Sequence, residues 1–487
     1  MYQTALRSRQ LSEIAVGEEG LVVLLELDPP RMLKSLTINY CHSMTVLPAT
    51  LLRQTALEEL RINDTELTCL PDQLELFVKL RKITIHSSGG LFQLPESFGR
   101  LQSLETLSIS DCAITCLPES FGQLAALQKL ELVHLFSLTC LPESVGQLKS
   151  LQSFTIQCLA ITCLPESFGQ LAALEQLKLV SLNLLTSLPG SLGRLTALNK
   201  LQITNCGALT CLPESLEQLG KLQTLVIDCC RTLTRLPQST GLLPALQNME
   251  IDCEHHIAVP QSPQLFATVS SLVVRLHGRS HPPKWLEQFV KLQTLSIVSG
   301  NDLIIIPELR HFTTLQSLTL YNCDALTSLP ESLGLLTTLQ NMYLSCGALT
   351  NLPESLGQLS ALKTLTLICA ELRCLPESFG RLKKLENVLL QSCKELTRWP
   401  KSIGYLINLR RLDVYCCSKM SKTIPGFILS SNENGSLQVG NSTGFYPHMS
   451  CYISILTMEL GMRRRRRPRL PSELLLLVID AVLDLAY

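Results

Sequence analysis

Cysteine is the residue type in this chain with the widest range of possible chemistry. The 487 residues include 20 cysteines, and thiolates can act as nucleophiles, form disulfides or bind metal ions. Cys112 and Cys116 have a spacing found between metal ligands, and residues Cys253–His256 place a thiol beside two imidazoles. A structural zinc ion, however, needs four ligands that converge on one point. The positions of the other cysteines decide between metal binding and packing.

Most of the cysteines occupy two fixed positions of a repeating unit. One set stands at the ninth position of the unit and consists of Cys41, Cys112, Cys206, Cys230, Cys323, Cys393 and Cys417. The other set precedes a Leu-Pro pair and consists of Cys69, Cys116, Cys140, Cys163, Cys211 and Cys374. Because both sets follow the repeat, we interpret them as small buried side chains. We expect the S–H groups of the first set to donate weak hydrogen bonds to backbone carbonyls. We therefore expect reduced thiols in a cytoplasmic or nuclear protein, with no metal and no cofactor.

Carboxylates also recur, once per unit. Eight Pro-Glu-Ser segments supply glutamates from Glu96 to Glu377. We interpret these side chains as caps on the outer surface and not as an acid/base pair. The sequence contains no nucleophile elbow, zinc-protease helix, phosphate loop or kinase signature, and its nine histidines do not recur beside a serine or cysteine. We therefore expect that the chain is not an enzyme.

Proline marks the repeating unit most clearly. Seventeen prolines from Pro48 to Pro425 follow one another at intervals of 23 to 25 residues. In the unit that ends at Pro118, polar and apolar residues alternate over Thr106–Ser110, which predicts a half-buried strand. The side chains expected to point inward are those of Leu104, Leu107 and Ile109.

The segment after each proline is predicted to form a short helical turn. In Pro-Glu-Ser-Phe-Gly-Gln-Leu, proline suits the first helical position, Glu119 favours the positive end of the turn, and Gly122 relaxes its exit. One strand and one turn cannot bury a core alone, but stacked units can. The predicted result is a solenoid.

The pattern L-x-x-L-x-L-x-x-C/N resembles that of leucine-rich repeats and covers residues 33–429, about 17 repeats. The resemblance implies an α/β fold: a horseshoe solenoid with a parallel concave sheet and short helical or irregular convex turns. The signature Leu-Pro-Glu-Ser-x-Gly-x-Leu with a terminal cysteine resembles the intracellular repeats of plant disease-resistance receptors and of plant Ras-group leucine-rich-repeat proteins. The sequence lacks the Gly-x-x-x-x-Gly-Lys-Ser/Thr phosphate loop of such receptors, so it resembles their sensor half alone.

The resemblance implies a non-catalytic module that binds a protein partner on its concave face, in intracellular defence-type signalling. Strand register exposes alternate residues on this face, and most are small and polar. Two patches differ: an acidic cluster beside an arginine, and a group of tyrosines. We predict that they bind a basic protein segment, although drift on a polar face could also place such residues together. The candidate partner-binding residues are Asp228, Glu250, Asp252, Arg275, Tyr321, Tyr343 and Tyr415.

Composition restricts the other classes of partner. Hydrophobic residues make up 46% and charged residues 17%, which excludes wholesale disorder. Lys+Arg and Asp+Glu both number 41, so no general attraction to nucleic acid or membrane is expected. No apolar run fits a secretory signal or a membrane-spanning helix.

Between His255 and Phe312 the Pro-Glu-Ser signature disappears but the proline interval persists, so the solenoid is expected to continue with altered outer turns around Trp285.

Three further segments flank the predicted solenoid. Residues 1–32 are expected to cap it, with a possible strand at Leu21–Leu27, and residues 430–462 form a polar linker. Residues 463–487 join a basic run, Arg463–Arg469, to an apolar helix. The basic run suits nuclear import, an RNA or anionic-membrane contact, or a solvated segment. The helix resembles the first helix of an F-box, which makes a substrate adaptor of a ubiquitin ligase the alternative function.

Overall fold

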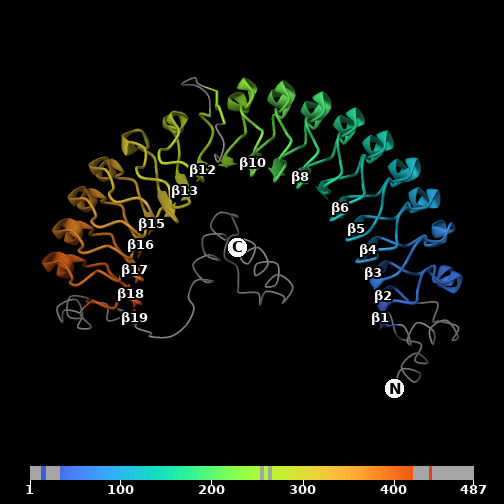
Figure 1. Cartoon of the computed structure of the whole chain (residues 1–487), viewed down its shortest axis with the longest axis horizontal. Helices are drawn as coiled ribbons and strands as arrows, with labels where there is room; N and C mark the ends of the chain where they lie inside the picture. The colour runs from blue at the N-terminus through green and yellow to red at the C-terminus, as the bar shows by residue number, and fades with distance from the viewer. Residues whose placement is uncertain (1–12, 18–32, 253–256, 261–265, 421–437, 441–487) are drawn as a thin grey trace, which may run out of the picture. The chain divides into compact units, whose positions relative to one another are not determined.

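The computed structural model describes residues 13–17, 33–252, 257–260, 266–420 and 438–440 (Figure 1). The chain divides into two compact units, Met1–Gly440 and Asn441–Tyr487, and the second lies wholly outside the described residues. The predicted strand at Leu21–Leu27, the segment Cys253–His256, the linker after residue 440, the basic run and the F-box-like helix also lie outside them. Among the described residues, no helix combines the length and the apolar character needed to cross a membrane.

The first unit is built on one parallel sheet. Its described residues form nineteen strands, and each strand pairs in parallel with the next along the chain. The strands are β1 Glu13–Val16, β2 Ser35–Cys41, β3 Glu59–Thr65, β4 Lys82–His86, β5 Thr106–Ser110, β6 Lys129–Val133, β7 Ser153–Gln157, β8 Gln176–Val180, β9 Lys200–Thr204, β10 Thr224–Asp228, β11 Asn248–Asp252, β12 Ser271–Leu276, β13 Thr294–Ser299, β14 Ser317–Tyr321, β15 Asn341–Ser345, β16 Thr364–Ile368, β17 Asn387–Gln391, β18 Arg411–Tyr415 and β19 Gln438–Gly440.

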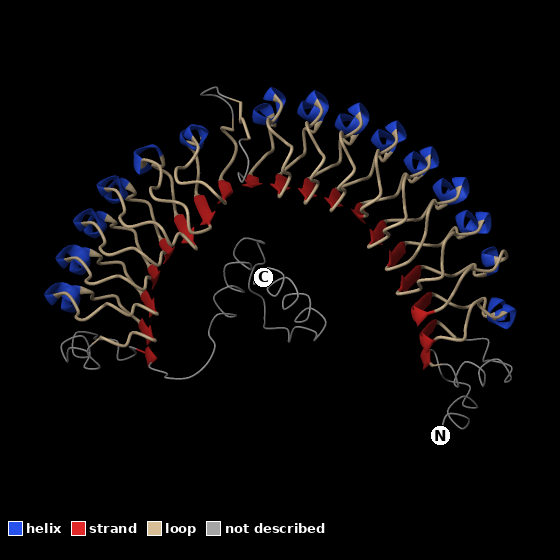
Figure 2. Ribbon diagram, viewed as in Figure 1, coloured by secondary structure: helices blue, strands red, loops and turns tan. Residues whose placement is uncertain are grey.

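A short 3₁₀ helix follows most strands. We call one strand and the segment up to the next strand a coil. The 3₁₀ helices are η1 Ala49–Arg53, η2 Leu74–Leu76, η3 Glu96–Arg100, η4 Glu119–Gln123, η5 Glu143–Gln147, η6 Glu166–Gln170, η7 Gly190–Arg194, η8 Glu214–Gln218, η9 Gln238–Leu242, η10 Lys284–Gln288, η11 Leu309–His311, η12 Glu331–Leu335, η13 Glu354–Gln358, η14 Glu377–Arg381 and η15 Lys401–Tyr405. Figure 2 shows the strands along the inner, concave side of this unit and the 3₁₀ helices along its outer side.

The core lies between these two layers and confirms the predicted strand pattern. Leu104, Leu107 and Ile109 are fully buried, while the polar residues of β5 are partly exposed. Leu107 pairs in register with Ile83 on one side and Leu130 on the other. Each apolar position therefore forms a continuous column through the solenoid, because neighbouring coils place the same position at the same depth.

The irregular middle segment continues this sheet, as predicted. Strands β11, β12 and β13 pair without interruption of the order, and Trp285 is buried within η10. At the two ends, β1 pairs with β2, and β19 extends the sheet to Gly440, beyond the predicted boundary at residue 429. The strand described before β2 is Glu13–Val16, upstream of the segment favoured by the sequence.

The proline of each unit lies just before the 3₁₀ helix and not at its first position, contrary to the prediction. Pro118 has an extended backbone with φ −68° and ψ 154°, and Glu119 is the first residue of η4. The carbonyl of Pro118 accepts the backbone N–H of Phe121 at 3.0 Å. Proline suits this place because it needs no partner for an N–H group and holds φ near the value required.

Gly122 serves close packing between coils, not the relaxed exit that the sequence suggested. A Cβ atom at Gly122 would lie 2.1 Å from the carbonyl oxygen of Ser144 in the next coil. The same contact recurs along the outer side, and we call it the glycine–serine column. Its pairs are Gly99–Ser120, Gly122–Ser144, Gly146–Ser167, Gly169–Ser191, Gly193–Ser215, Gly334–Ser355, Gly357–Ser378 and Gly380–Ser402.

Six of the eight glutamates of the Pro-Glu-Ser segments act as caps, but they cap the 3₁₀ helix of the following coil. Glu166 accepts the backbone N–H groups of Gly190 at 3.2 Å and of Ser191 at 3.1 Å. The equivalent bonds join Glu96 to Ser120, Glu143 to Ser167, Glu331 to Ser355, Glu354 to Ser378 and Glu377 to Ser402. Each carboxylate thus satisfies N–H groups at the start of a helix that have no partner within it.

Replacing Glu166 with alanine should weaken the start of η7. The Ser191 hydroxyl, foremost, and the two backbone N–H groups lower the pKa of Glu166. A pKa below its unfolded value means that the cap stabilises the fold above the unfolded pKa and is lost as pH falls through the folded pKa. At neutral pH we expect a cost of about 0.5 kcal/mol in local opening, small because solvent screens this exposed group.

Amide hydrogen exchange at Ser191 measures this loss. Glu217→Ala is the control. Glu217 lies in η8, and its side chain makes no hydrogen bond within the part of the chain that the structure describes. A Glu166→Ala cost that persists unchanged at pH 3 would contradict the role assigned to the carboxylate.

Candidate functional site

The concave face is formed by the first, third and fifth residues of each strand. In β5 these are Thr106, Ser108 and Ser110, all partly exposed, and β7 presents a similar polar row. These two strands match the predicted small and polar rows. The two predicted patches lie on strands β10–β12 and β14–β15.

The acidic residues and the arginine of the first patch come together. We call Asp228, Glu250, Asp252 and Arg275 the Arg275 cluster. Asp252 on β11 pairs in register with Arg275 on β12. The guanidinium reaches back over β11, with Nε in an ion-pair contact 3.2 Å from Oδ1 of Asp228, while Nη2 donates to Glu250. Three carboxylates and one guanidinium leave a formal charge of −2 on the cluster.

Burial and charge act in opposite directions within the Arg275 cluster. Burial raises the pKa of Asp228, Arg275 opposes this rise, and the carboxylates of Glu250 and Asp252 reinforce it. Burial acts to lower the pKa of Arg275, but Glu250 and Asp228 outweigh it and raise the value. The guanidinium therefore stays charged, and its surroundings disfavour the ionisation of Asp228.

Replacing Asp228 with asparagine should leave the fold as stable at pH 7, or slightly more so. A carboxyl group whose pKa is higher in the folded state weakens the fold as pH rises through that value, and asparagine removes this effect. We expect a gain of less than about 1 kcal/mol at pH 7 that disappears below about pH 4. Denaturant unfolding followed between pH 3 and pH 8 measures it.

Glu250→Gln is the comparison for this experiment. It weakens the direct bond from Arg275 and should destabilise the fold at pH 7. An Asp228→Asn protein that loses more stability than Glu250→Gln would show that the Arg275 contact outweighs burial at Asp228.

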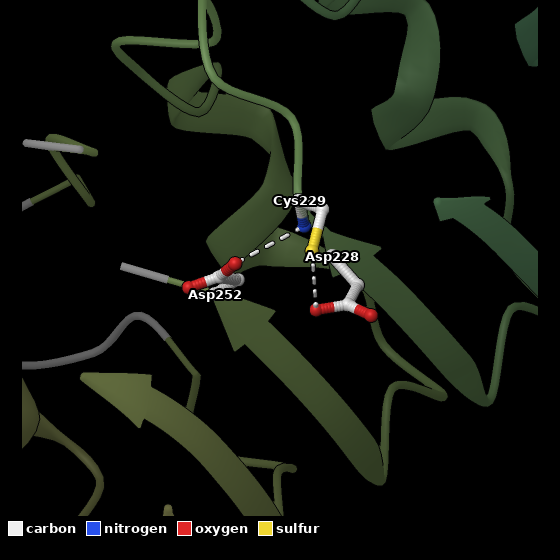
Figure 3. Close-up of side chains that lie close together, drawn as sticks. All are labelled: Asp228, Cys229 and Asp252. Atoms are coloured by element: carbon white, nitrogen blue, oxygen red, sulfur yellow. Dashed lines mark hydrogen bonds between the residues drawn. The ribbon is translucent and has the colours of Figure 1, made fainter. Parts of the chain in front are cut away.

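The same region brings three potential metal ligands together. One ligand atom each of Asp228, Cys229 and Asp252 lies within 4.8 Å of the others (Figure 3). The Cys229 thiol is 3.7 Å from Asp228, and the Cys229 backbone N–H donates to Asp252 at 3.2 Å. Burial, and then the charge of Asp228, raise the pKa of Cys229 to about 12, so the thiol keeps its proton at neutral pH. Because Arg275 already supplies a cation, this arrangement fits an internal ion-paired cluster better than a metal site.

Two of the three predicted tyrosines form a pair. Tyr321 ends β14 and Tyr343 is central in β15, and their rings stack with centroids 6.3 Å apart and planes 29° apart. Both rings are partly exposed on the concave face. Tyr415 ends β18, three strands beyond β15, so the structure separates it from this pair by roughly 14 Å of sheet.

Two lysines adjoin the Arg275 cluster and were not singled out from the sequence. Lys178 on β8 and Lys200 on β9 lie on adjacent paired strands. Burial, and next the charge of Lys178, lower the pKa of Lys200. Glu250 partly offsets this effect. The sequence signal that could have revealed them is their register: Lys178 is the third residue of β8 and Lys200 is the first residue of β9, and both positions face the concave side. The concave face therefore changes from basic at β8–β9 to acidic at β10–β11.

The two cysteine sets have different outcomes. Most of the first set is buried, and its thiols donate to backbone carbonyls as predicted, for example from Cys112 to Ser110 at 3.3 Å and from Cys393 to Gln391 at 3.5 Å. For the second set the prediction of burial is wrong. Cys69 is half-buried, and the exposed members are Cys116, Cys140, Cys163, Cys211 and Cys374. Cys112 and Cys116 thus differ in burial, which does not fit a shared metal ion.

Comparison with known proteins identifies the family. The model of the leucine-rich repeat region matches residues 130–303 and 296–428, more than half of the chain. The chain belongs to the leucine-rich-repeat family. Leucine-rich-repeat domains generally mediate protein–protein interaction and are typically non-catalytic. The comparison with curated proteins found no match.

Solved structures share the fold of this leucine-rich-repeat chain. A leucine-rich-repeat protein of Leptospira interrogans is similar with a TM-score of 0.55 and 24% identity, over 88% of this chain and 100% of that one. A chain of the Drosophila Toll–Spatzle complex is similar with a TM-score of 0.53 and 17% identity, over 90% of this chain and 60% of that one. At these identities the likeness concerns the fold alone.

Proposed function

We propose that this leucine-rich-repeat chain is a non-catalytic recognition module whose concave face binds a basic segment of a protein partner. The observation that supports it most is the position of the Arg275 cluster and the tyrosine pair on one uninterrupted run of strands, β10–β15. Six strands extend over roughly 24 Å at about 4.8 Å per step. This length suits an extended segment of several residues and exceeds the needs of a small metabolite.

The chemistry of the two patches complements a basic segment. Beside Arg275, the side chains of Asp228 and Glu250 remain 20% and 25% exposed, so a second cation can reach them. The partly exposed faces of Tyr321 and Tyr343 can receive an arginine or lysine through cation–π contact. Tyrosine and arginine are also the residues that most often dominate binding energy at protein interfaces.

The pathway in this proposal is intracellular defence-type signalling, in the cytoplasm or nucleus. It rests on the resemblance of the Leu-Pro-Glu-Ser-x-Gly-x-Leu units to the repeats of plant disease-resistance receptors. The alternative, a substrate adaptor of a ubiquitin ligase, depends on the F-box-like helix at 470–487, outside the described residues. The first helix of an F-box docks on the Skp adaptor of ubiquitin ligases. Deleting residues 470–487 should therefore remove a Skp-type adaptor from purified complexes only if this alternative holds.

Site-specific cross-linking tests the proposed surface. A photoreactive phenylalanine analogue at position 343 of the full chain should capture a partner from a eukaryotic lysate, and mass spectrometry should locate the cross-link in a lysine- or arginine-rich segment. The same analogue at Leu335, exposed on the outer side in η12, is the control. Glu250→Lys should abolish capture at position 343. Equal capture at both positions, or an acidic cross-linked segment, would contradict the proposal.

A further inference from the structure

Three exposed thiols lie in consecutive coils on a surface that the proposed function does not use. Cys116, Cys140 and Cys163 occupy the same position after β5, β6 and β7, between each strand and its 3₁₀ helix. The other members of this set have different neighbours: Cys211 pairs with Ser187 and Cys374 with Asn351. Because the three thiols are exposed, core packing does not explain them.

Backbone contacts hold these three coils in register at the thiols. The N–H of Thr139 donates to the carbonyl of Thr115 at 3.4 Å, and the N–H of Thr162 donates to that of Thr139 at 3.4 Å. The next residue in each coil is the cysteine. The Thr115 hydroxyl contacts the Cys116 sulfur at 3.9 Å, and the Thr139 hydroxyl contacts the Cys140 sulfur at 4.0 Å. Because these contacts match, we expect Cys116 and Cys140 to share one orientation and their thiols to lie about one coil spacing apart.

The coil spacing decides which chemistry the thiols can perform. In the sheet, the N–H of Gln128 lies 2.8 Å from the carbonyl of Glu105 in the same two coils, against 3.4 Å at the threonines. The backbones at the threonines are therefore slightly farther apart than adjacent strands, which lie ~4.8 Å apart, and we expect a similar separation between the thiols. A disulfide requires Cβ atoms about 3.8 Å apart, so it would have to draw the coils together by about 1 Å. Two metal–thiolate bonds of about 2.3 Å, the length of a zinc–sulfur bond, span about 4.6 Å, so a metal ion between two thiolates fits the expected spacing.

We propose that Cys116, Cys140 and Cys163 form a binding site for a soft monovalent metal ion, Cu(I), held between the sulfurs of adjacent coils. Thiolates are the ligands that select Cu(I). On binding, two thiols release two protons to solvent and two metal–sulfur bonds form, with no change of oxidation state. Cys140 is the shared ligand, because it adjoins both of the others. Cys116 and Cys163 are two coils apart and cannot hold one ion between them.

Competition with a chromophoric Cu(I) chelator under anaerobic conditions tests this site in the full chain. The wild-type protein should retain one tightly bound equivalent that Cys140→Ser lacks, with at least a ten-fold loss of affinity. Cys116→Ser and Cys163→Ser should each keep the equivalent, since one adjacent pair remains. Cys211→Ser is the matched control, because Cys211 is exposed and contacts Thr210 at 3.9 Å in the same way but faces Ser187 in the coil before it.

A gain-of-function variant makes the test independent of lost stability. Ser187→Cys places a thiol between Cys163 and Cys211 and should add a second bound equivalent. The proposal is overturned if Cys211→Ser loses as much Cu(I) as Cys140→Ser, or if Ser187→Cys adds none. A Cys116–Cys140 disulfide that forms in air would also overturn it, because it would show that the coils close more easily than an ion is bound.

Discussion

Replacing Gly122 with alanine should destabilise the coils around η4 and η5 by about 1–3 kcal/mol. The new Cβ would lie 2.1 Å from the carbonyl oxygen of Ser144 and 2.8 Å from its carbonyl carbon. Both are backbone atoms of a packed neighbour, so the contact can be relieved only by separating two coils. Such a separation also disturbs η4 and the buried leucine side chains that pack between the coils, because each coil is stabilised mainly by its neighbours.

Hydrogen exchange resolved by peptide measures this effect, since a long repeat array need not unfold in one step. The free energy of local opening should fall for residues 119–147 and stay unchanged in distant coils. Gly220→Ala is the control, because a Cβ there meets no atom within 4 Å. It should be neutral or stabilising by up to about 1 kcal/mol, through the reduced freedom of the unfolded chain. Equal losses for the two variants would show that the close contact is not what requires glycine.

Replacing Arg275 with glutamine should cost about 1–3 kcal/mol at pH 7. The substitution leaves Asp228, Glu250 and Asp252 near one another without the guanidinium between them. Asp252 is only 5% exposed, so water can replace little of the charge stabilisation that the guanidinium provides. The cost should shrink as pH falls toward 4, because protonation of Asp228, whose pKa is raised by burial, removes part of the repulsion.

Denaturant unfolding at pH 7 and pH 4 measures this dependence. Arg310→Gln is the control: its ion pair with Glu308, at 3.3 Å, joins side chains that are 60% and 49% exposed. Such a pair should change stability by less than about 0.5 kcal/mol at either pH. If Arg275→Gln behaves like Arg310→Gln, the cluster is solvated well enough to need no internal cation.

The strands could be predicted from the sequence because their signal is local. The alternation over Thr106–Ser110 and the inward positions of Leu107 and Ile109 depend only on the two-residue period of a strand. The roles of Gly122 and Glu166 could not be predicted in the same way. Their partners, Ser144 and Ser191, lie 22 and 25 residues away in the next coil, so an interpretation confined to one unit assigns both residues to their own turn.

The candidate site also contains some contacts that the sequence predicts and others that it does not. Register alone brings Asp252 beside Arg275, and the sequence was sufficient to predict this. The contact from Arg275 to Asp228 passes over a whole strand and depends on the conformation of a long side chain, which no sequence period specifies. Tyr415 was grouped with the other tyrosines by residue type, but distance along a solenoid grows with every coil.

The periodicity of the second cysteine set was equally visible in the sequence, but its exposure was not. A recurring small residue in a loop can face the core or the solvent, and both choices repeat with the same interval. Cys112 is buried while Cys116, four residues later, is exposed. Only the path of the backbone between β5 and η4 distinguishes the two.

The glycine–serine column also has a geometric consequence. Hydrogen bonds between strands fix the coil spacing on the inner side, and the contact of each glycine with the next serine limits it on the outer side. The difference between these two spacings determines the radius of curvature of the solenoid. A bulkier residue at these glycines would widen only the outer spacing and bend the arc more tightly. If a partner binds as proposed, residues on the outer side therefore control how broad a partner the concave face can receive.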